Sequence, residues 1–396
     1  MKKTTKKRIL FISSNMEIGG FQKSLVSLLP CFDFNIYDID LLLFSPHGIF
    51  FDLIPSQVNI LPPIIPEAYF YRAPKAVIKL LMQRNFSLAG RRLVSGLVSL
   101  YNKGRSAEIL SRAIPPLPGN YDAAIDFNGQ YILYYLVNSI SARKKISFFH
   151  NDYKMWPYYE STDRYYYSFV DNIATVSDLC VESMKKIFPE HQHKIYCIEN
   201  IVSEKTVNIF PTGSNSFSDD FHGIRLVTVG RVCDDKGIYL ALKCCSELKH
   251  RNFPFHWYWV GPFDNQDDYP SLLAQHNIET EFTFLGPTNN PYDYMRDATL
   301  IVHPAKFEGK AVAIEEAKVL GKPIVATNFS TVGNQLIDGE TGLIVPMDPV
   351  ALADAIERIL DDQVLYRKIE KNLAAFKNGN ENEIQKLYHL IEGTPL

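Results

Sequence analysis

The sequence predicts an α/β protein with two doubly wound parallel sheets. Short apolar runs typical of buried strands alternate with longer stretches of helical spacing, and this alternation occurs in two separate series. A segment rich in Ser, Asn, Thr and Asp separates the series at residues 202–223. The length of 396 residues also fits two domains of ordinary size better than one. A single larger sheet is the alternative interpretation.

The first series opens with the apolar run Arg8–Ser13, which is followed by a Gly19-Gly20 turn and by helical spacing. Four further runs have the length and the apolar content of buried strands: Ile39–Phe44, Ala123–Phe127, Lys145–Phe149 and Asn172–Val176. Since helix-compatible stretches separate most of them, we expect these strands to run parallel in one sheet.

The second series starts with the run Arg225–Val229. Its further strand candidates are His256–Val260, Phe282–Leu285, Thr299–His303, Pro323–Thr327 and Gly342–Val345. Helices are predicted at Pro349–Leu360 and at Glu383–Ile391. We therefore expect an N-terminal domain at residues 1–202 and a C-terminal domain at residues 203–379. Ligands of such sheets bind outside the carboxyl ends of the strands.

The composition and the net charge argue against several classes of protein. Hydrophobic residues make up 46% of the chain and the formal net charge is −3, unlike a disordered chain or a general nucleic-acid binder. The six cysteines have neither Cys-x-x-Cys pairs nor metal-ligand spacing, which is typical of buried thiols in a reducing compartment. No run approaches the ~20 apolar residues of a membrane-spanning helix. We expect a cytoplasmic protein or one that is peripheral on the inner face of the cell membrane.

The charge is distributed unevenly along the chain. Residues 1–200 contain 23 basic and 17 acidic residues, whereas residues 201–396 contain 18 and 27. Within the basic half, residues 72–105 contain eight basic residues, no acidic one and many interleaved apolar ones. Together with the five basic residues of the N-terminal tail, this segment suits an anionic membrane surface. A solvated helix pair that covers the first domain accounts for the pattern equally.

The largest group of candidate ligand-binding residues follows the predicted strand that ends at His303. The next loop carries Glu308 and Gly309, and a helix continues to about residue 320. Gly309 lets the backbone approach a ligand closely, and the start of the helix offers unpaired N–H groups to an anion. Glu308 precedes this positive end, Glu316 lies about a turn and a half inside the helix, and Glu315 should face solvent. A solvated helix with incidental carboxylates is the alternative.

A second charged group follows the predicted strand Arg225–Val229. Gly230 and Arg231 end this run, and Lys236 and Gly237 follow five residues later. A diphosphate leaving group needs positive charge where its own negative charge develops. Arg231 offers a planar fork of donors and Lys236 a compact point charge. A surface ion pair with one of the two intervening aspartates is the alternative.

Two further features lie in the first half of the chain. His150 ends the strand that begins at Lys145, and this position at a carboxyl end favours a functional role over a structural one. The string Asp38-Ile39-Asp40 matches the Asp-x-Asp motif that holds a divalent metal in other enzymes, but it directly precedes an apolar run. We expect this string to be structural. We also expect no metal, because Arg231 and Lys236 form a cationic clamp that neutralises the diphosphate without one.

These motifs together resemble glycosyltransferase family 4, whose members have the GT-B fold of two Rossmann-like domains that face each other across a cleft. The E-x7-E motif of the family is matched by Glu308 and Glu316. Its G-R-x4-K-G pattern is matched by Gly230, Arg231, Lys236 and Gly237, and its GG-x-E/Q-K/R loop by residues 19–23. The sequence departs from the family at residues 309–311, which are often Gly-Phe-Gly, and at residues 200–203, which are often Asn-Gly-Ile/Val-Asp.

The resemblance implies a role for each matched position. Glu308 would contact the donor sugar, Glu316 the ribose hydroxyls, and Arg231 with Lys236 the diphosphate. His150 would contact the donor sugar near the reacting carbon, so Glu308, His150, Arg231 and Lys236 are the implied catalytic residues. The implied donor-binding set also contains the backbone of Gly19, Gly20, Gly230, Gly309, Lys310, Ala311 and Val312.

The resemblance also implies a function. It is a retaining hexosyltransferase that moves a sugar from a nucleotide-diphosphate sugar to a glycan or lipid-linked saccharide, as in capsule, O-antigen, lipopolysaccharide or exopolysaccharide biosynthesis. The N-terminal domain would bind the acceptor, the C-terminal domain the donor, and a final helix at about residues 380–396 would pack back onto the N-terminal domain. No cofactor, metal or nucleic acid is implied. A non-catalytic sugar-nucleotide binding protein and a GT-B-like epimerase are the alternatives.

Overall fold

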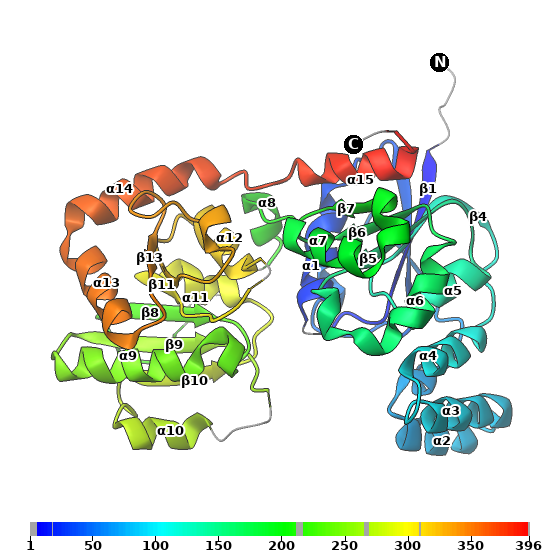
Figure 1. Ribbon diagram of the computed structural model, residues 1–396, viewed down its shortest axis with the longest axis horizontal. Coiled ribbons are helices and arrows are strands. Elements are labelled where there is room, and N and C mark those ends of the chain that lie inside the picture. Colours follow the sequence, from blue (N-terminus) through cyan, green and yellow to red (C-terminus); the bar gives the residue numbers. More distant parts are fainter. Residues whose placement is uncertain (1–5, 18, 211–216, 265–268, 309, 395–396) are drawn as a thin grey trace. The chain divides into compact units, whose positions relative to one another are not determined.

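The chain divides into two compact units in a computed structural model that describes residues 6–17, 19–210, 217–264, 269–308 and 310–394. The first unit extends to Asn200 and also contains the C-terminal segment from Asn382. The second unit extends from Ile201 to Glu381. Each unit contains one parallel sheet with helices packed around it (Figure 1). Among the described residues, every helix is too short or too polar to cross a membrane.

The sheet of the first unit has the strand order β3-β2-β1-β4-β5-β6-β7, and its neighbouring strands pair in parallel. The strands are β1 (Lys7–Ser13), β2 (Tyr37–Leu43), β3 (Asn59–Leu61), β4 (Asn120–Asp126), β5 (Ser141–Phe149), β6 (Asn172–Thr175) and β7 (Ile195–Cys197). All five predicted strands are present. The two unpredicted strands, β3 and β7, are edge strands of three residues each, which is too short to give a periodic pattern in the sequence.

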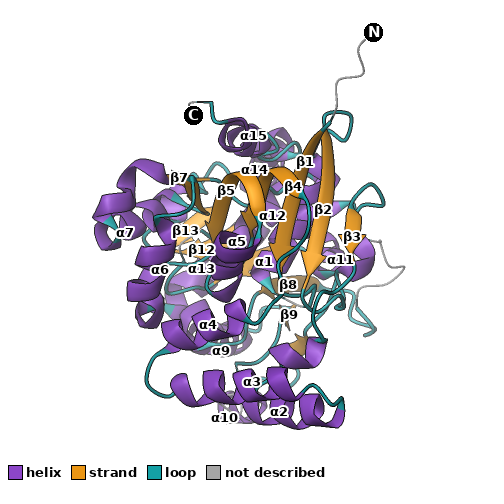
Figure 2. Ribbon diagram, turned by 90° about the vertical axis from the view of Figure 1, so that its right-hand side faces the viewer, coloured by secondary structure: helices purple, strands orange, loops and turns teal. Residues whose placement is uncertain are grey.

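Helices of this unit lie beside the sheet, and α2 and α3 lie beyond the ends of its strands (Figure 2). They are α1 (Gly20–Leu28), α2 (Ala73–Met82), α3 (Phe86–Val98), α4 (Lys103–Arg112), α5 (Tyr131–Ser139), α6 (Glu160–Tyr167), α7 (Asp178–Ile187) and α15 (Glu383–Glu392). The C-terminal helix α15 contacts the first unit through Tyr388, whose ring stacks on that of Tyr37 at 4.9 Å. The Tyr388 hydroxyl also accepts a hydrogen bond from the Asp33 backbone N–H at 2.9 Å.

The sheet of the second unit has the strand order β10-β9-β8-β11-β12-β13. Its strands are β8 (Ile224–Val229), β9 (Phe255–Val260), β10 (Phe282–Gly286), β11 (Leu300–His303), β12 (Ile324–Thr327) and β13 (Leu343–Val345), and all were predicted. Its helices are α8 (Glu204–Val207), α9 (Ile238–His250), α10 (Tyr269–His276), α11 (Pro291–Asp297), α12 (Val312–Val319), α13 (Pro349–Asp361) and α14 (Gln363–Leu373).

Both sheets reverse their strand order once, between β1 and β4 in the first unit and between β8 and β11 in the second. At such a switch point the connections on either side of the two strands lead away in opposite directions, which leaves a crevice at the carboxyl ends. The loops that follow β8 and β11 are therefore the part of the second unit in which a ligand site is expected.

The segment predicted as a linker is partly folded. Ser203 and Thr206 form a reciprocal capping box at the start of α8, and both side chains are buried. The Val202 backbone N–H donates to the side chain of Asn380 at 2.8 Å. Gly379 has a φ of +54° and lies so close that a Cβ there would be 1.7 Å from the Val202 carbonyl oxygen. These contacts fix both ends of the second unit to each other. Residues 211–216 of the predicted linker lie outside the described residues.

Candidate active site

The loops that follow β8 and β11 pack tightly against each other at the switch point of the second sheet. Gly237 lies between a 3₁₀ turn at Asp234–Lys236 and the helix α9, with a φ of +79°. A Cβ at this position would lie 1.8 Å from the carbonyl oxygen of Pro304, so only glycine fits. Gly230, which follows β8, has a φ of +157°, and its carbonyl accepts a hydrogen bond from the Trp259 indole at 2.9 Å. The two glycines of the predicted clamp therefore shape the loop that presents its cations.

Glu308 is the centre of a small group of charged and polar side chains at this point. Its Oε1 atom forms an ion pair with Lys236 Nζ and lies 3.3 Å from His303 Nε2. Burial by itself raises the pKa of Glu308, but the hydrogen bond from His303 and the charge of Lys236 outweigh burial and lower it below its ordinary value. Because its side chain is only 11% exposed, the carboxylate is an ionised group shielded from solvent.

The two predicted clamp cations lie in different environments. Lys236 is paired with Glu308, and Asp234, which was the alternative partner, forms an ion pair with Lys306 instead. Arg231 is exposed, and its guanidinium makes no hydrogen bond or ion pair with any residue that the structure describes. The site thus presents one neutralised cation and one cation that is available to an anion.

The loop between Glu308 and α12 is held by side chains that the sequence did not indicate. Thr331 Oγ1 donates to the Glu308 carbonyl at 2.9 Å. The Gln335 amide accepts from the Ala311 N–H and donates to the Ala311 carbonyl, both at 2.9 Å. These two residues lie more than twenty positions away in the chain, so no local motif connects them with the loop. Gly309 lies outside the described residues.

The contact with Gln335 corrects one expectation about anion binding. The Ala311 N–H was expected to be available to the diphosphate, but it is already bonded to the Gln335 side chain. Helix α12 begins at Val312 without a side-chain cap, and the N–H groups of Val312 and Ala313 have no acceptor among the described residues. The backbone donors of this helix start that are available to an anion are therefore those of Val312, which was expected, and of Ala313, which was not.

Two consecutive glutamates of α12 differ in their surroundings. Glu316 is 2% exposed, and its Oε1 atom accepts a hydrogen bond from the Tyr292 hydroxyl at 3.0 Å. Glu315 was expected to be solvated, but it is partly buried and bonded to both Lys318, at 3.0 Å, and Gln335, at 2.9 Å. Its carboxylate therefore belongs to the support of the 308–311 loop.

In the first unit, the Gly19-Gly20 loop and His150 lie near each other beyond the carboxyl ends of the strands. Gly19 precedes α1 in an extended conformation, and a Cβ there would meet the side chain of Gln22, whereas one at Gly20 would meet open space. The ring of Phe21, the next residue, lies 6.3 Å from that of His150. The structure thus brings two separately predicted features of the first half together.

His150 is a neutral, half-buried histidine whose ring nitrogens are shielded from solvent. Its ring lies 4.5 Å from that of Phe127 and 5.6 Å from that of Phe148. Burial lowers the pKa of His150 to about 4, and the backbone of Phe127 offsets only part of this effect. Neither ring nitrogen has a hydrogen-bond partner of ordinary geometry among the described residues. An unsatisfied buried imidazole at a strand end is the arrangement expected of a group that awaits a polar ligand.

The Asp-x-Asp string of the first unit is engaged in ordinary contacts. Asp38 forms an ion pair with Lys6 at 3.1 Å. Asp40 accepts hydrogen bonds from Arg8 at 2.9 Å and from Asn59 at 2.6 Å. These bonds connect β2 with its two neighbouring strands, β1 and β3.

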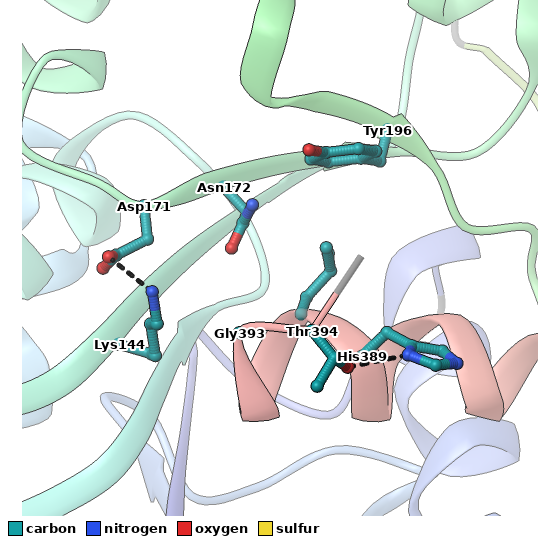
Figure 3. A pocket seen from close by; sticks show the side chains of 8 residues that line it. Lys144, Asp171, Asn172, Tyr196, His389, Gly393 and Thr394 are labelled. Carbon is teal, nitrogen blue, oxygen red and sulfur yellow. Dashed lines mark hydrogen bonds and ion pairs between the residues drawn. The ribbon is translucent and has the colours of Figure 1, made fainter. Parts of the chain in front are cut away.

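A separate pocket of about 320 Å³ lies beside α15 (Figure 3). It is lined by Lys144, Asp171, Asn172 and Tyr196 from the strand side. Lys144 points toward Asp171 and is paired with it at 3.2 Å, so its charge is compensated. These residues lie at or near the beginnings of β5 and β6 or in the short β7, whereas His150 follows the end of β5. The pocket is therefore distinct from the carboxyl-end edge at which His150 lies.

Comparison with known proteins identifies the domain that carries the Glu308 group. Residues 223–362 match the family model described as glycosyl transferases group 1. This part of the second unit is thus similar to that family, and both the switch-point loops and α12 lie within the matched residues.

The relatives and the solved structures extend this likeness. The chain is 27% identical over 149 residues to alpha-D-kanosaminyltransferase of Streptomyces kanamyceticus. The matched segment covers 37% of this chain and 39% of the relative. The chain is 22% identical over 221 residues to the capsular polysaccharide biosynthesis glycosyltransferase CapM of Staphylococcus aureus. That segment covers 50% of this chain and 57% of the relative. Each match thus spans less than two thirds of the relative's length.

The structure of HepE from Anabaena in complex with UDP and glucose matches 98% of this chain and 99% of that chain, with a TM-score of 0.64 and 16% identity. This likeness concerns the fold. The fold is GT-B, which confirms the predicted fold class.

Proposed function

We propose that the protein is a retaining glycosyltransferase of family 4 that acts in the biosynthesis of a surface polysaccharide. The donor is a nucleotide-diphosphate sugar and the acceptor is a hydroxyl of a glycan or of a lipid-linked saccharide. The group 1 domain at residues 223–362 and the likeness to CapM, a capsular polysaccharide biosynthesis glycosyltransferase, support this proposal. HepE, which has the same fold, was solved with UDP and glucose.

One observation carries the proposal. At the switch point between β8 and β11, the available cation Arg231, the paired cation Lys236 and the uncapped start of α12 come from adjacent loops. A diphosphate carries charge that a guanidinium, an ammonium and free backbone N–H groups can all bind. Glu308 beside Lys236 and Glu316 inside α12 then supply acceptors for the hydroxyls of a sugar and of a ribose.

We infer that the ion pair between Glu308 and Lys236 exchanges partners when the donor binds. The diphosphate takes the place of Glu308 beside Lys236 Nζ, because two phosphate groups offer more negative charge than one carboxylate. Glu308 then accepts a hydrogen bond from a hydroxyl of the donor sugar. Tyr292 and Gln335 act as positioning residues, since the first holds Glu316 and the second holds the loop at Ala311.

In the proposed reaction, the bond between the anomeric carbon and the diphosphate oxygen breaks while the acceptor oxygen bonds to the same face of that carbon. The leaving diphosphate takes the proton of the acceptor hydroxyl, so the atoms balance without a protein nucleophile. Arg231, Lys236 and the α12 N–H groups stabilise the charge that develops on the diphosphate. Neutral His150 offers a hydrogen bond to the donor sugar from the first unit, which we assign to the acceptor. We propose that no metal is required, and full turnover in EDTA would agree with this.

Incubation with UDP-, GDP- and ADP-sugars tests the function and separates it from its alternatives. We expect release of the free nucleoside diphosphate from one class of donor, and faster release when an acceptor glycan is added. An epimerase would instead convert the donor sugar without release of nucleotide. A non-catalytic binding protein would bind the donor and leave it intact, and either result would contradict the proposal.

A further inference from the structure

Helices α2 and α3 form a hairpin that exposes an apolar face. The face they share with the rest of the unit is made of small and apolar side chains such as Ala76, Leu80 and Ala89, which are buried. Their other face carries large apolar side chains at helical spacing, all of them exposed: Ile78, Leu81, Met82, Phe86, Leu93, Val94 and Leu97. Met82, near the turn of the hairpin, is 78% exposed. A helix pair that only covered the sheet would have polar side chains on this outer face.

The hairpin is also strongly and exclusively basic. Residues 72–105 contain eight basic residues and no acidic one. Among the described residues, Arg105 is the only one of these eight that forms an ion pair, with Glu108 at 3.6 Å. Lys75 and Lys79 flank Ile78 on the exposed face of α2, and Arg84 lies in the turn between the helices. Lys79 lies near enough to Glu67 to lower the pKa of that carboxyl, whereas Lys75, Arg84 and Arg91 form no ion pair with any residue that the structure describes. The hairpin therefore keeps positive charge without a carboxylate partner beside its apolar stripe.

The N-terminal tail contributes less positive charge than its composition suggested. Lys6 is paired with Asp38, Lys7 with Glu392 and Arg8 with Asp40. These three residues of the tail are therefore neutralised by neighbouring carboxylates. Lys2 and Lys3 lie outside the described residues.

The hairpin has a defined place in the first unit. Figure 2 shows it beyond the ends toward which β1 and β2 point, and Figure 1 shows it on the same side from a second direction. This is the side of the carboxyl ends, on which the Gly19-Gly20 loop and His150 lie. A surface bound by the hairpin would thus face the edge of the unit that we assign to the acceptor.

We propose that the α2–α3 hairpin binds an anionic phospholipid bilayer, with its apolar stripe in the acyl–headgroup boundary and Lys75, Lys79, Arg84 and Arg91 among the headgroups. The charge of the hairpin favours a bilayer over a second copy of the chain as the partner of this face. A symmetric contact through this face would bring two uncompensated basic clusters together without a carboxylate in either. An anionic bilayer supplies both an apolar layer and the opposite charge.

Vesicle sedimentation of the full-length protein tests this proposal. We expect binding to vesicles that contain phosphatidylglycerol, none to pure phosphatidylcholine vesicles, and weaker binding at high salt. The variant Lys75→Glu/Arg84→Glu should bind at least about tenfold more weakly, since each basic residue near an anionic surface contributes about fivefold. The control Lys185→Glu/Lys186→Glu, on the exposed face of α7, should bind like the wild type. Equal binding to both kinds of vesicle, or to neither, would overturn the proposal.

A second pair of variants tests insertion independently of charge and of folding. A tryptophan at position 97 (Leu97→Trp) should shift its emission to the blue when anionic vesicles are added, while Val364→Trp, at an 81% exposed position of α14, should not. The double variant Met82→Asp/Leu97→Asp should lose binding while donor turnover in solution persists. If the wild type is instead a dimer without vesicles, and this variant a monomer, the face joins two copies of the chain and the proposal is wrong. Because turnover is measured separately, a failure here is distinct from a failure of the proposed transfer reaction.

Discussion

Glu308 and Lys236 neutralise each other in a place where neither is freely exposed to water. An ion pair at this depth is costly to separate unless another charge replaces the lost partner. A diphosphate provides this replacement for Lys236, and Arg231 is available beside it. The charges of these three side chains therefore suit the diphosphate of the proposed donor.

Replacement of Arg231 should change the preference between nucleotides. In the wild type, a nucleoside diphosphate should bind more tightly than the monophosphate, because its second phosphate meets Arg231. A charged hydrogen bond contributes about 1.5–3 kcal/mol, so Arg231→Gln should reduce this preference by roughly tenfold or more. Calorimetric titration with both nucleotides measures it, and Arg367→Gln, an exposed arginine of α14, is the control. An unchanged preference in Arg231→Gln would exclude this residue from the phosphate site.

A buried carboxylate in the first unit makes its stability depend on pH. Asp163 accepts hydrogen bonds at 2.5 Å from the hydroxyls of Tyr134 and Tyr153. Burial raises the pKa of Asp163 to about 7, and the two hydrogen bonds lower it only in part. Between about pH 4 and pH 7 the unfolded chain has released this proton and the folded chain keeps it. Asp163 therefore stabilises the fold below its unfolded pKa, and this contribution is lost as the pH rises toward 7.

The variant Asp163→Asn tests the direction of this effect. The asparagine does not titrate, so the unfolding temperature of the first unit should fall less between pH 5 and pH 7 in the variant than in the wild type. Thermal unfolding followed by circular dichroism measures this slope, and Asp361→Asn, at an exposed position in the second unit, should leave it unchanged. A variant slope equal to that of the wild type would assign the pH dependence to another group.

At the scale of the elements, the strands were predictable from the sequence because each predicted run is four to six residues long and has at least three apolar residues, in a row or in alternation. The edge strands β3 and β7 have only three residues each and gave no such signal. The loops of the site were predictable as motifs, but their support was not. Lys236 and Glu308 are 72 positions apart, and Gln335 is 24 positions from Ala311, so only the fold brings them together.

The close contact between the loop after β8 and Pro304 depends on Gly237. Gly237→Ala should destabilise the second unit by at least about 2 kcal/mol, because the side chain adds an overlap with Pro304 to the strain of a positive φ. Gly321→Ala is a matched control, since Gly321 also has a positive φ of +68° but has open space around its Cβ position. Its cost should be only about 1–2 kcal/mol. Urea unfolding of both variants measures the difference, and equal costs would contradict the close contact between the two loops.

At the scale of the whole molecule, two sheets of the same strand order carry different chemical groups at their carboxyl ends. The second unit has the cations, the glutamates and the helix start, and the first has a neutral histidine at this edge. This division suits a donor with a charged leaving group and an acceptor that reacts through a hydroxyl. The basic α2–α3 hairpin, which we propose binds an anionic bilayer, lies on the carboxyl-end side of the first unit.

The most direct test is donor turnover by the wild type and by two lysine variants, with the sugar nucleotide that the donor panel selects. Lys236→Met should lower kcat/KM by about 10²–10³, which is typical for the loss of one stabilising group of a developing anion. Lys306→Met, in the next loop, removes a lysine that is paired with exposed Asp234 and should keep nearly full activity. Equal activity of Lys236→Met and the wild type would contradict a diphosphate site at the β8–β11 switch point.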